Sequence, residues 1–242
     1  MASTNQLHVA GATVNCATCK DQSCFIQDGL TDEQLQGVSQ ISTSRGPYQP
    51  GETIFQIEDP FKSLYVVQSG ATKIETVSPD GCNLVDGFYF RGDVLGLEAI
   101  GSTLYQHDAV ALEETWLCEL PYEHLESLCT FIPRLQHKIL IMLGRKLRHM
   151  NKMFLHGRYL NAEERLMLFF RMLCHKQVIR KKANSATLTL TMSKGDIASY
   201  LGLRAESLSR ALTRLQKAGL IHNHGKTIEF HDIDRILAFS CD

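Results

Sequence analysis

Three cysteines lie close together near the start of the chain. The stretch "NCATCKDQSC", residues 15–24, places Cys16, Cys19 and Cys24 in a C-x2-C-x4-C spacing. The segment before them, "MASTNQLHVAGATVN", has no basic region followed by an apolar one, so we expect no secretory signal. A chain in the cytoplasm keeps its thiols reduced, and clustered cysteines there bind metal more often than they form disulfides. The spacing therefore favours a metal site.

Charge is distributed very unevenly. Residues 1–133 carry 5 Lys and Arg against 18 Asp and Glu, whereas residues 134–242 carry 20 against 8. Within 176–226 the count is 10 basic residues to 2 acidic ones. This pattern is typical of a regulatory body attached to a domain that binds a polyanion. No run approaches the ~18 apolar residues of a membrane helix, so we expect no membrane contact.

The first half of the chain reads as a helix followed by short strands. Thr31 with Gln34 forms a capping box, which predicts a short helix over 30–42 with Leu35 and Val38 buried. From Tyr48 to about Pro121, short apolar stretches alternate with turn residues and predict an all-β sandwich or barrel. The sequence Ser-Pro-Asp-Gly at 78–81 predicts a hairpin turn. Residues 121–132 predict a short helix that stops before Pro133.

Residues 134–156 form the longest helical pattern and contain six basic residues and no acidic ones. Apolar residues recur at spacings of three and four, which is the seam of a coiled coil. The neighbouring apolar residues supply a second stripe for packing on the β domain. We therefore expect a dimerisation helix whose basic flanks, Arg145, Lys146, Arg148 and Lys152, face like charges across a parallel pair. The predicted seam consists of Leu140, Leu143, Leu147, Met150 and Phe154.

The stretch from 191 to 232 divides into helix, turn, helix and hairpin. Ser193 with Asp196 predicts a capped first helix, and Gly202 supplies the turn after it. The second helix, about 205–219, buries three leucines and exposes a polar, mostly basic face. The alternating stretch "LIHNHGKTIEF" predicts a two-stranded wing. This is the pattern of a winged helix-turn-helix, whose second helix reads the major groove of DNA with Arg on guanine and Glu on cytosine.

The chain resembles the cyclic-AMP receptor protein superfamily along almost its whole length, and the fumarate and nitrate reduction regulator (FNR) branch most closely. The resemblance is carried by "SLYVVQSG", "FRGDVLGLEAIGS", "LCELPYE", "NAEERL", "GDIASYLGL" and "ESLSR". It implies an α+β fold with a β-roll sensor domain, a long dimerisation helix and a winged helix-turn-helix. The expected domains are 1–29, a cysteine-bearing segment; 30–133, the β-roll; 134–158, the dimerisation helix; and 159–242, the DNA-binding domain.

The resemblance also implies a function and site residues. In oxygen-sensing members, three N-terminal cysteines and one at the end of the β-roll hold a [4Fe-4S] cluster; by position these are Cys16, Cys19, Cys24 and Cys118. The expected protein is a cytoplasmic homodimer that binds palindromic DNA, contacts RNA polymerase and responds to oxygen. This sequence has four residues, where the best-known spacing has five, between the second and third cysteines. The residues expected to contact DNA are Arg204, Glu206, Ser207, Ser209, Arg210 and Arg214.

Other functions remain open from the sequence. A structural zinc ion also suits four cysteine thiolates. A nucleotide effector is disfavoured, because relatives that bind cyclic nucleotides pair an Arg with the phosphate and "GSTLYQHDAVAL" has none. A dithiol redox enzyme using Cys16 and Cys19 is also disfavoured, since the motif lies in a polar coil before the first fold element. The remaining cysteines, Cys82, Cys129, Cys174 and Cys241, are expected to be ordinary side chains.

Overall fold

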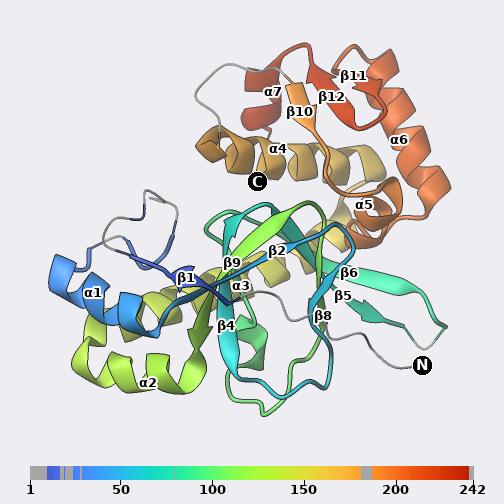
Figure 1. Cartoon of the computed structure of the whole chain (residues 1–242). Helices are drawn as coiled ribbons and strands as arrows, with labels where there is room; N and C mark the ends of the chain where they lie inside the picture. Colours follow the sequence, from blue (N-terminus) through green and yellow to red (C-terminus); the bar gives the residue numbers. More distant parts are fainter. Residues whose placement is uncertain are drawn as a thin grey trace. The chain divides into compact units, whose positions relative to one another are not determined.

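The computed structural model describes residues 10–16, 19, 24–27, 29–78, 80–180 and 187–239. The chain divides into two compact units, one of residues 1–76 with 86–146 and one of residues 77–85 with 147–242. No helix within the described residues is both long and apolar enough to cross a lipid bilayer. The elements are drawn in Figure 1.

The first unit contains two antiparallel sheets. One has the order β1-β2-β9-β4-β7, formed by Ala10–Thr13, Thr43–Tyr48, Thr115–Pro121, Ser63–Ser69 and Val94–Leu95. The other has the order β3-β8-β5-β6, formed by Thr53–Phe55, Asp108–Ala111, Ala71–Val77 and Asn83–Phe90. A short 3-10 helix, Leu97–Ala99, follows β7. The predicted β-rich region is confirmed, although it begins earlier than Tyr48 because β1 and β2 precede that residue.

Helices complete the first unit. Helix α1, Asp32–Ile41, begins at the predicted Thr31 capping box and buries Leu35 and Val38 as expected. Helix α2, Tyr122–Phe131, follows β9 directly, and α3, Pro133–Tyr159, starts two residues later. One apolar core joins α1, α2 and the start of α3 to the sheet, with Leu125 and Leu135 both fully buried in it.

The second unit contains the helix-turn-helix. Helix α4, Ala162–Arg180, precedes a three-stranded sheet of order β10-β12-β11, formed by Thr187–Thr189, Thr227–Phe230 and Ile221–His224. Helix α5, Lys194–Tyr200, carries the predicted capping box of Ser193 and Asp196. Helix α6 is Ala205–Lys217, and a short helix α7, Ile233–Leu237, ends the described part. The wing predicted from sequence has two strands, whereas β10 adds a third.

The connection between β5 and β6 belongs to the second unit. Its hairpin contains the predicted turn, in which Gly81 N donates to the Ser78 carbonyl at 2.9 Å and Gly81 has a φ of 78°. Pro79 lies outside the described residues. In α5, Ser199 Oγ accepts from the Val85 amide at 2.9 Å and donates to the Asn83 carbonyl at 3.1 Å. One hydroxyl therefore joins the base of the hairpin to the first helix of the helix-turn-helix.

Gly70 permits a close approach within the first unit. It joins β4 to β5 with a φ of 89°, and an added Cβ would meet Thr115 Oγ1 and lie 2.5 Å from the Glu114 carbonyl oxygen. Gly51 has a similar φ of 87° but has nothing within 4 Å of an added Cβ. The two glycines thus share a left-handed backbone and differ in the space around it.

We expect Gly70→Ala to lower the free energy of unfolding by about 2–5 kcal/mol, because it adds a steric clash to the cost of a left-handed backbone. Gly51→Ala should cost only about 1–2 kcal/mol, the backbone part alone. Urea unfolding followed by fluorescence of Trp116, the single tryptophan, measures both. Equal losses for the two variants would contradict the clash.

Candidate cysteine site and nucleic-acid interface

The segment that carries the N-terminal cysteines is attached to the first unit, here called the β unit, at residues 10–16 and again at residues 24–27. Strand β1 pairs antiparallel with β2, and Cys16 N donates to Ser39 Oγ at 2.8 Å. Gln27 Nε2 donates to the Cys16 carbonyl, and Ile26 is buried in the same core as Cys16. The expectation that Cys16 and Cys19 precede the first fold element is therefore wrong, because pairing with β2 makes residues 10–13 a strand, although both cysteines lie outside any helix or strand.

Four thiols surround one small cavity. Cys16, Cys19 and Cys24 line it from the N-terminal segment, and Cys118 lines it from strand β9. Cys118 lies opposite Ser44 in the β2–β9 register. The hydroxyl of Ser42 lies 3.9 Å from Cys16 Sγ and also hydrogen-bonds the Cys118 thiol. The structure thus brings together all four cysteines expected to be ligands, from positions almost a hundred residues apart.

The two buried thiols of this cavity resist ionisation. Burial raises the pKa of Cys118 to about 12, and the neighbouring Cys16 thiol raises it further while Ser42 lowers it. Burial also raises the pKa of Cys16, against opposing hydrogen bonds from Ser39 and Ser42. Because metals bind the thiolate, a metal bound here displaces protons from both thiols.

The donor set suits an iron–sulfur cluster, since four cysteine thiolates are its usual ligands. Among the described residues, no three His, Cys, Asp or Glu side chains are arranged to hold a single metal ion. The cavity measures about 20 Å³, which is room for about one water molecule.

The other cysteines have different surroundings. Cys82 is exposed in the β5–β6 hairpin, and Cys174 is buried in α4. Cys129 is buried in α2, in the same core as Cys118, but does not line the cavity. Cys241 lies outside the described residues.

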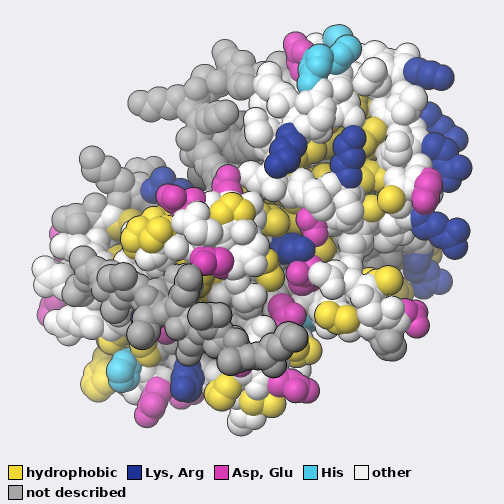
Figure 2. Space-filling view, turned by 45° about the vertical axis from the view of Figure 1, so that its right-hand side comes forward, with side chains coloured by type: hydrophobic (Ala, Val, Ile, Leu, Met, Phe, Trp, Pro, Cys, Tyr) yellow, Lys and Arg dark blue, Asp and Glu magenta, His cyan; other side chains and the backbone are white. Residues whose placement is uncertain are grey.

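Helix α6 presents the polar face predicted from the sequence. Its buried side, which includes Leu208, Leu212 and Leu215, packs into the second unit. Arg204, Glu206, Ser209 and Arg210 are exposed at its N-terminal end, and Ser207 is partly exposed. Arg210 Nη2 donates to Ser207 Oγ at 3.3 Å. Lys and Arg side chains follow one edge of the second unit (Figure 2).

Arg214 differs from the other residues expected to contact DNA. Its Nη1 lies 2.7 Å from Glu163 Oε1 of α4, and this ion pair holds the pKa of the Glu163 carboxyl below its ordinary value. Arg214 is still 70% exposed. The arginine therefore joins α6 to α4 while leaving most of its surface open to a phosphate.

Comparison with known proteins agrees with both halves of this arrangement. Residues 45–130 match the cyclic nucleotide-binding domain, and residues 164–239 match the Crp-like helix-turn-helix domain. The fumarate and nitrate reduction regulatory protein of Salmonella typhimurium is 32% identical over 235 residues, covering 97% of this chain and 94% of that protein. The chain belongs to the cyclic-AMP receptor protein superfamily, in its fumarate and nitrate reduction regulator branch. It is a DNA-binding transcription regulator rather than an enzyme.

Two further relatives support membership of this branch. Electron transport regulator A of Shewanella oneidensis is 35% identical and covers 90% of this chain and 87% of its own length. The structure of FixK2 from Bradyrhizobium japonicum superimposes with a TM-score of 0.71 at 27% identity, covering 83% of this chain and 98% of that one. The predicted fold, with a β sensor domain and a C-terminal winged helix-turn-helix, is thereby confirmed.

Helix α3 has two apolar faces in this regulator. Ile139, Met142 and Leu143 pack partly buried against the core that contains Cys16 and Cys118. The other predicted seam residues are exposed: Leu140 by 59%, Leu147 by 60%, Met150 by 50% and Phe154 by 64%. Leu143 is thus shared between the seam and the core.

Among the predicted basic flanks, Lys146 is not an isolated charge, because its Nζ lies 3.3 Å from Asp86 and donates to Tyr89.

The segment that holds phosphate in cyclic-nucleotide-binding relatives is also altered. Glu98 Oε1 lies 4.0 Å from His107 Nδ1, and neither atom has a hydrogen-bond partner among the described residues. No Lys or Arg occurs in the sequence between Arg91 and Arg134. The matched domain therefore has no Lys or Arg after Arg91.

Proposed function

We propose that this regulator responds to oxygen through a [4Fe-4S] cluster held by Cys16, Cys19, Cys24 and Cys118, and that it binds palindromic DNA as a homodimer. The observation that carries the proposal is the convergence of these four thiols on one cavity. When bound, such a cluster supplies a redox-active group that oxygen can attack. The names of the relatives, which refer to fumarate and nitrate reduction and to electron transport, support a role in anaerobic metabolism.

The chain's own residues connect the cysteine cavity to the dimer helix. Cys16 and Cys118 belong to one continuous core with Leu125 of α2 and Leu135 of α3. Ile139, Met142 and Leu143 extend that core along one side of α3. A displacement of the cysteine segment changes the packing of this face, and the seam lies on the same helix. The state of the cavity is thereby coupled to the fit of α3 against its partner.

The proposal excludes one possible partner, a cyclic nucleotide, and includes another, RNA polymerase. The absence of Lys and Arg between Arg91 and Arg134 favours a sensor domain that takes no cyclic nucleotide, since the phosphate would have neither side chain there to form a charge-assisted hydrogen bond. A regulator bound beside a promoter can act on transcription by contacting RNA polymerase, and we include that contact in the proposal.

We expect single Cys→Ser variants at 16, 19, 24 and 118 to lose the cluster, because each removes one thiolate ligand. Cys129→Ser is the matched control, as Cys129 is buried in the same core but does not line the cavity. Iron and acid-labile sulfide content, with visible absorption before and after air, measures occupancy in protein purified without oxygen. A colourless protein that contains zinc would instead establish the structural zinc site, and cluster loss in Cys129→Ser would contradict the ligand assignment.

Arg210→Ala should weaken binding to the specific site by about 1–3 kcal/mol, because a bidentate contact to guanine is lost. Binding to random DNA should remain nearly unchanged, since phosphate contacts supply most of it. Lys217→Ala, at the other end of α6, is the control and should weaken both DNAs alike. Fluorescence anisotropy with the two duplexes at one salt concentration measures the difference. An equal loss on both duplexes for Arg210→Ala would exclude base reading.

Leu147→Asp should raise the dimer dissociation constant at least about tenfold, because pairing would desolvate an unpaired carboxylate. Ile57→Asp, at a residue that is 44% exposed outside α3, is the control.

Since no predicted seam residue is charged, we also expect the cluster-free protein to keep a substantial dimer fraction. Sedimentation velocity at low and high salt measures both. A monomeric cluster-free protein at high salt would show instead that the cluster fully controls dimerisation.

A further inference from the structure

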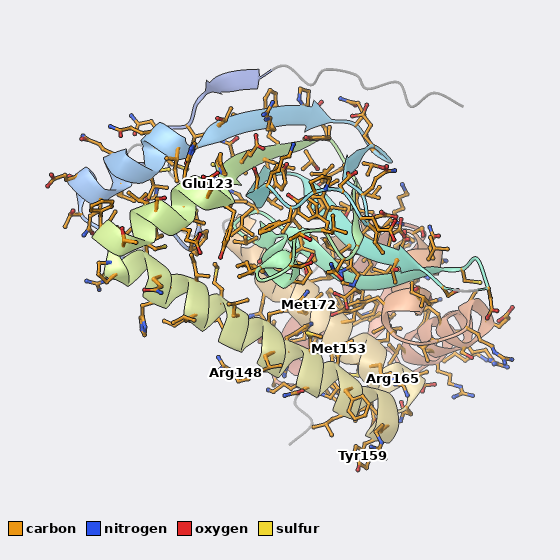
Figure 3. The ribbon with its side chains drawn as sticks, turned by 90° about the horizontal axis from the view of Figure 1, so that it is seen from below. Glu123, Arg148, Met153, Tyr159, Arg165 and Met172 are labelled. Atoms are coloured by element: carbon orange, nitrogen blue, oxygen red, sulfur yellow. The ribbon has the colours of Figure 1, made fainter. Side chains whose placement is uncertain are left out.

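The second unit contains a cavity far larger than the one between the cysteines. It measures about 570 Å³ and is lined by the C-terminal part of α3, by α4 and by residues 199–202. Figure 3 labels Met153 on α3 and Met172 on α4 beside one another on its walls. Small-molecule sites in proteins usually measure about 300–1,000 Å³, so this volume suits an organic ligand.

The walls of this cavity include a soft apolar surface. Met153, Phe169 and Met172 line it together with Tyr200. The Tyr200 hydroxyl lies 3.8 Å from the sulfur atoms of both methionines and 3.2 Å from His149 Nε2. Methionine side chains adapt to the shape of an apolar partner, and an aromatic ring offers a flat surface to it. The ligand therefore needs an apolar body.

The charge on the lining is of one sign. Among the described residues that line the cavity, Lys152, Arg165 and Arg171 are cationic and none is Asp or Glu. Arg165 is held in place by the carbonyls of Leu160, Gly157 and Leu201, at 3.0, 2.8 and 3.1 Å. Carbonyl oxygens orient a guanidinium without cancelling its charge. The positive charge of the lining is thus not balanced within the cavity.

The pKa of His156 is affected by the positive charge of the lining. His156 lines the cavity, and its pKa lies below the ordinary value because of burial and then the nearby charges of Lys152 and Arg171. A bound anion would offset both charges and stabilise the protonated ring.

We propose that this cavity is a binding site for an organic carboxylate with an apolar body. The carboxylate pairs with Lys152 and Arg171, and the body packs between Met153 and Met172. Tyr200, Leu201 and Gly202 form the end of α5 and the turn before α6, so a ligand here contacts the helix-turn-helix directly. This site is separate from the cysteine cavity and requires no cluster.

Decanoate is a suitable probe, and decyltrimethylammonium carries the same chain with the opposite charge. Both are added to the full-length protein below their micelle-forming concentrations. Methyl NMR of protein labelled at methionine should show saturable shifts of the Met153 and Met172 signals with decanoate and not with the cation. The absence of saturable shifts, or equal responses to both probes, would overturn the proposal.

Lys152→Gln tests the charge. It should weaken decanoate binding by about threefold, the usual effect of one partly exposed ion pair. Arg148→Gln is the matched control on the same helix: it removes the same charge, and Figure 3 places Arg148 on the other side of α3 from Met172. Both side chains are exposed, so folding should be unaffected. Equal weakening in the two variants, or none in Lys152→Gln, would refute recognition of the carboxylate.

Discussion

Strand β9 forms the central partition of the β unit, and the neighbouring elements depend on its pairing. It pairs with β2 along one edge and with β4 along the other. Its side chains alternate between two cores, with Leu117 in one and with Cys118 and Leu120 in the other. A shift of one residue in its register would exchange these faces. The position of Cys118 is therefore set by the hydrogen bonding of the whole sheet. The N-terminal segment reaches the common cavity by packing against that fixed position.

Local signals in the sequence predicted the parts of the fold that are governed locally. The caps at Thr31 and Ser193, the turn at Gly202 and the buried stripe of α6 each depend on residues that lie no more than four positions from the next one. Strand β1 was missed because "AGAT" is short and has no large apolar side chain, and it is a strand only through pairing with β2. Helix α4 was missed because its buried residues face several neighbours and do not form one stripe; they include Leu166, Met167, Phe169, Phe170, Leu173 and Cys174.

The two cavities differ in how far sequence alone could reveal them. The cysteine cavity was predictable because thiols are rare and the family resemblance paired Cys118 with the N-terminal three. The exact contacts, such as the Ser42 hydroxyl against Cys16 and Cys118, required the folded chain. The large cavity has no motif: Met153, Arg171 and Tyr200 come from separate helices, and each residue type has an ordinary role elsewhere. Only packing shows that their side chains share one space.

The hairpin between β5 and β6 has a consequence for how this chain is made. Residues 77–85 are synthesised well before residues 147–242, yet they complete the unit that those residues form. During synthesis, the hydrogen bond from the Val85 amide to Ser199 therefore cannot form until more than a hundred further residues have been added to the chain. For the same reason, a fragment cut at the start of α4 would leave the Ser199 hydroxyl without its two backbone partners. Excision of the DNA-binding half as an independent module would remove part of its own packing.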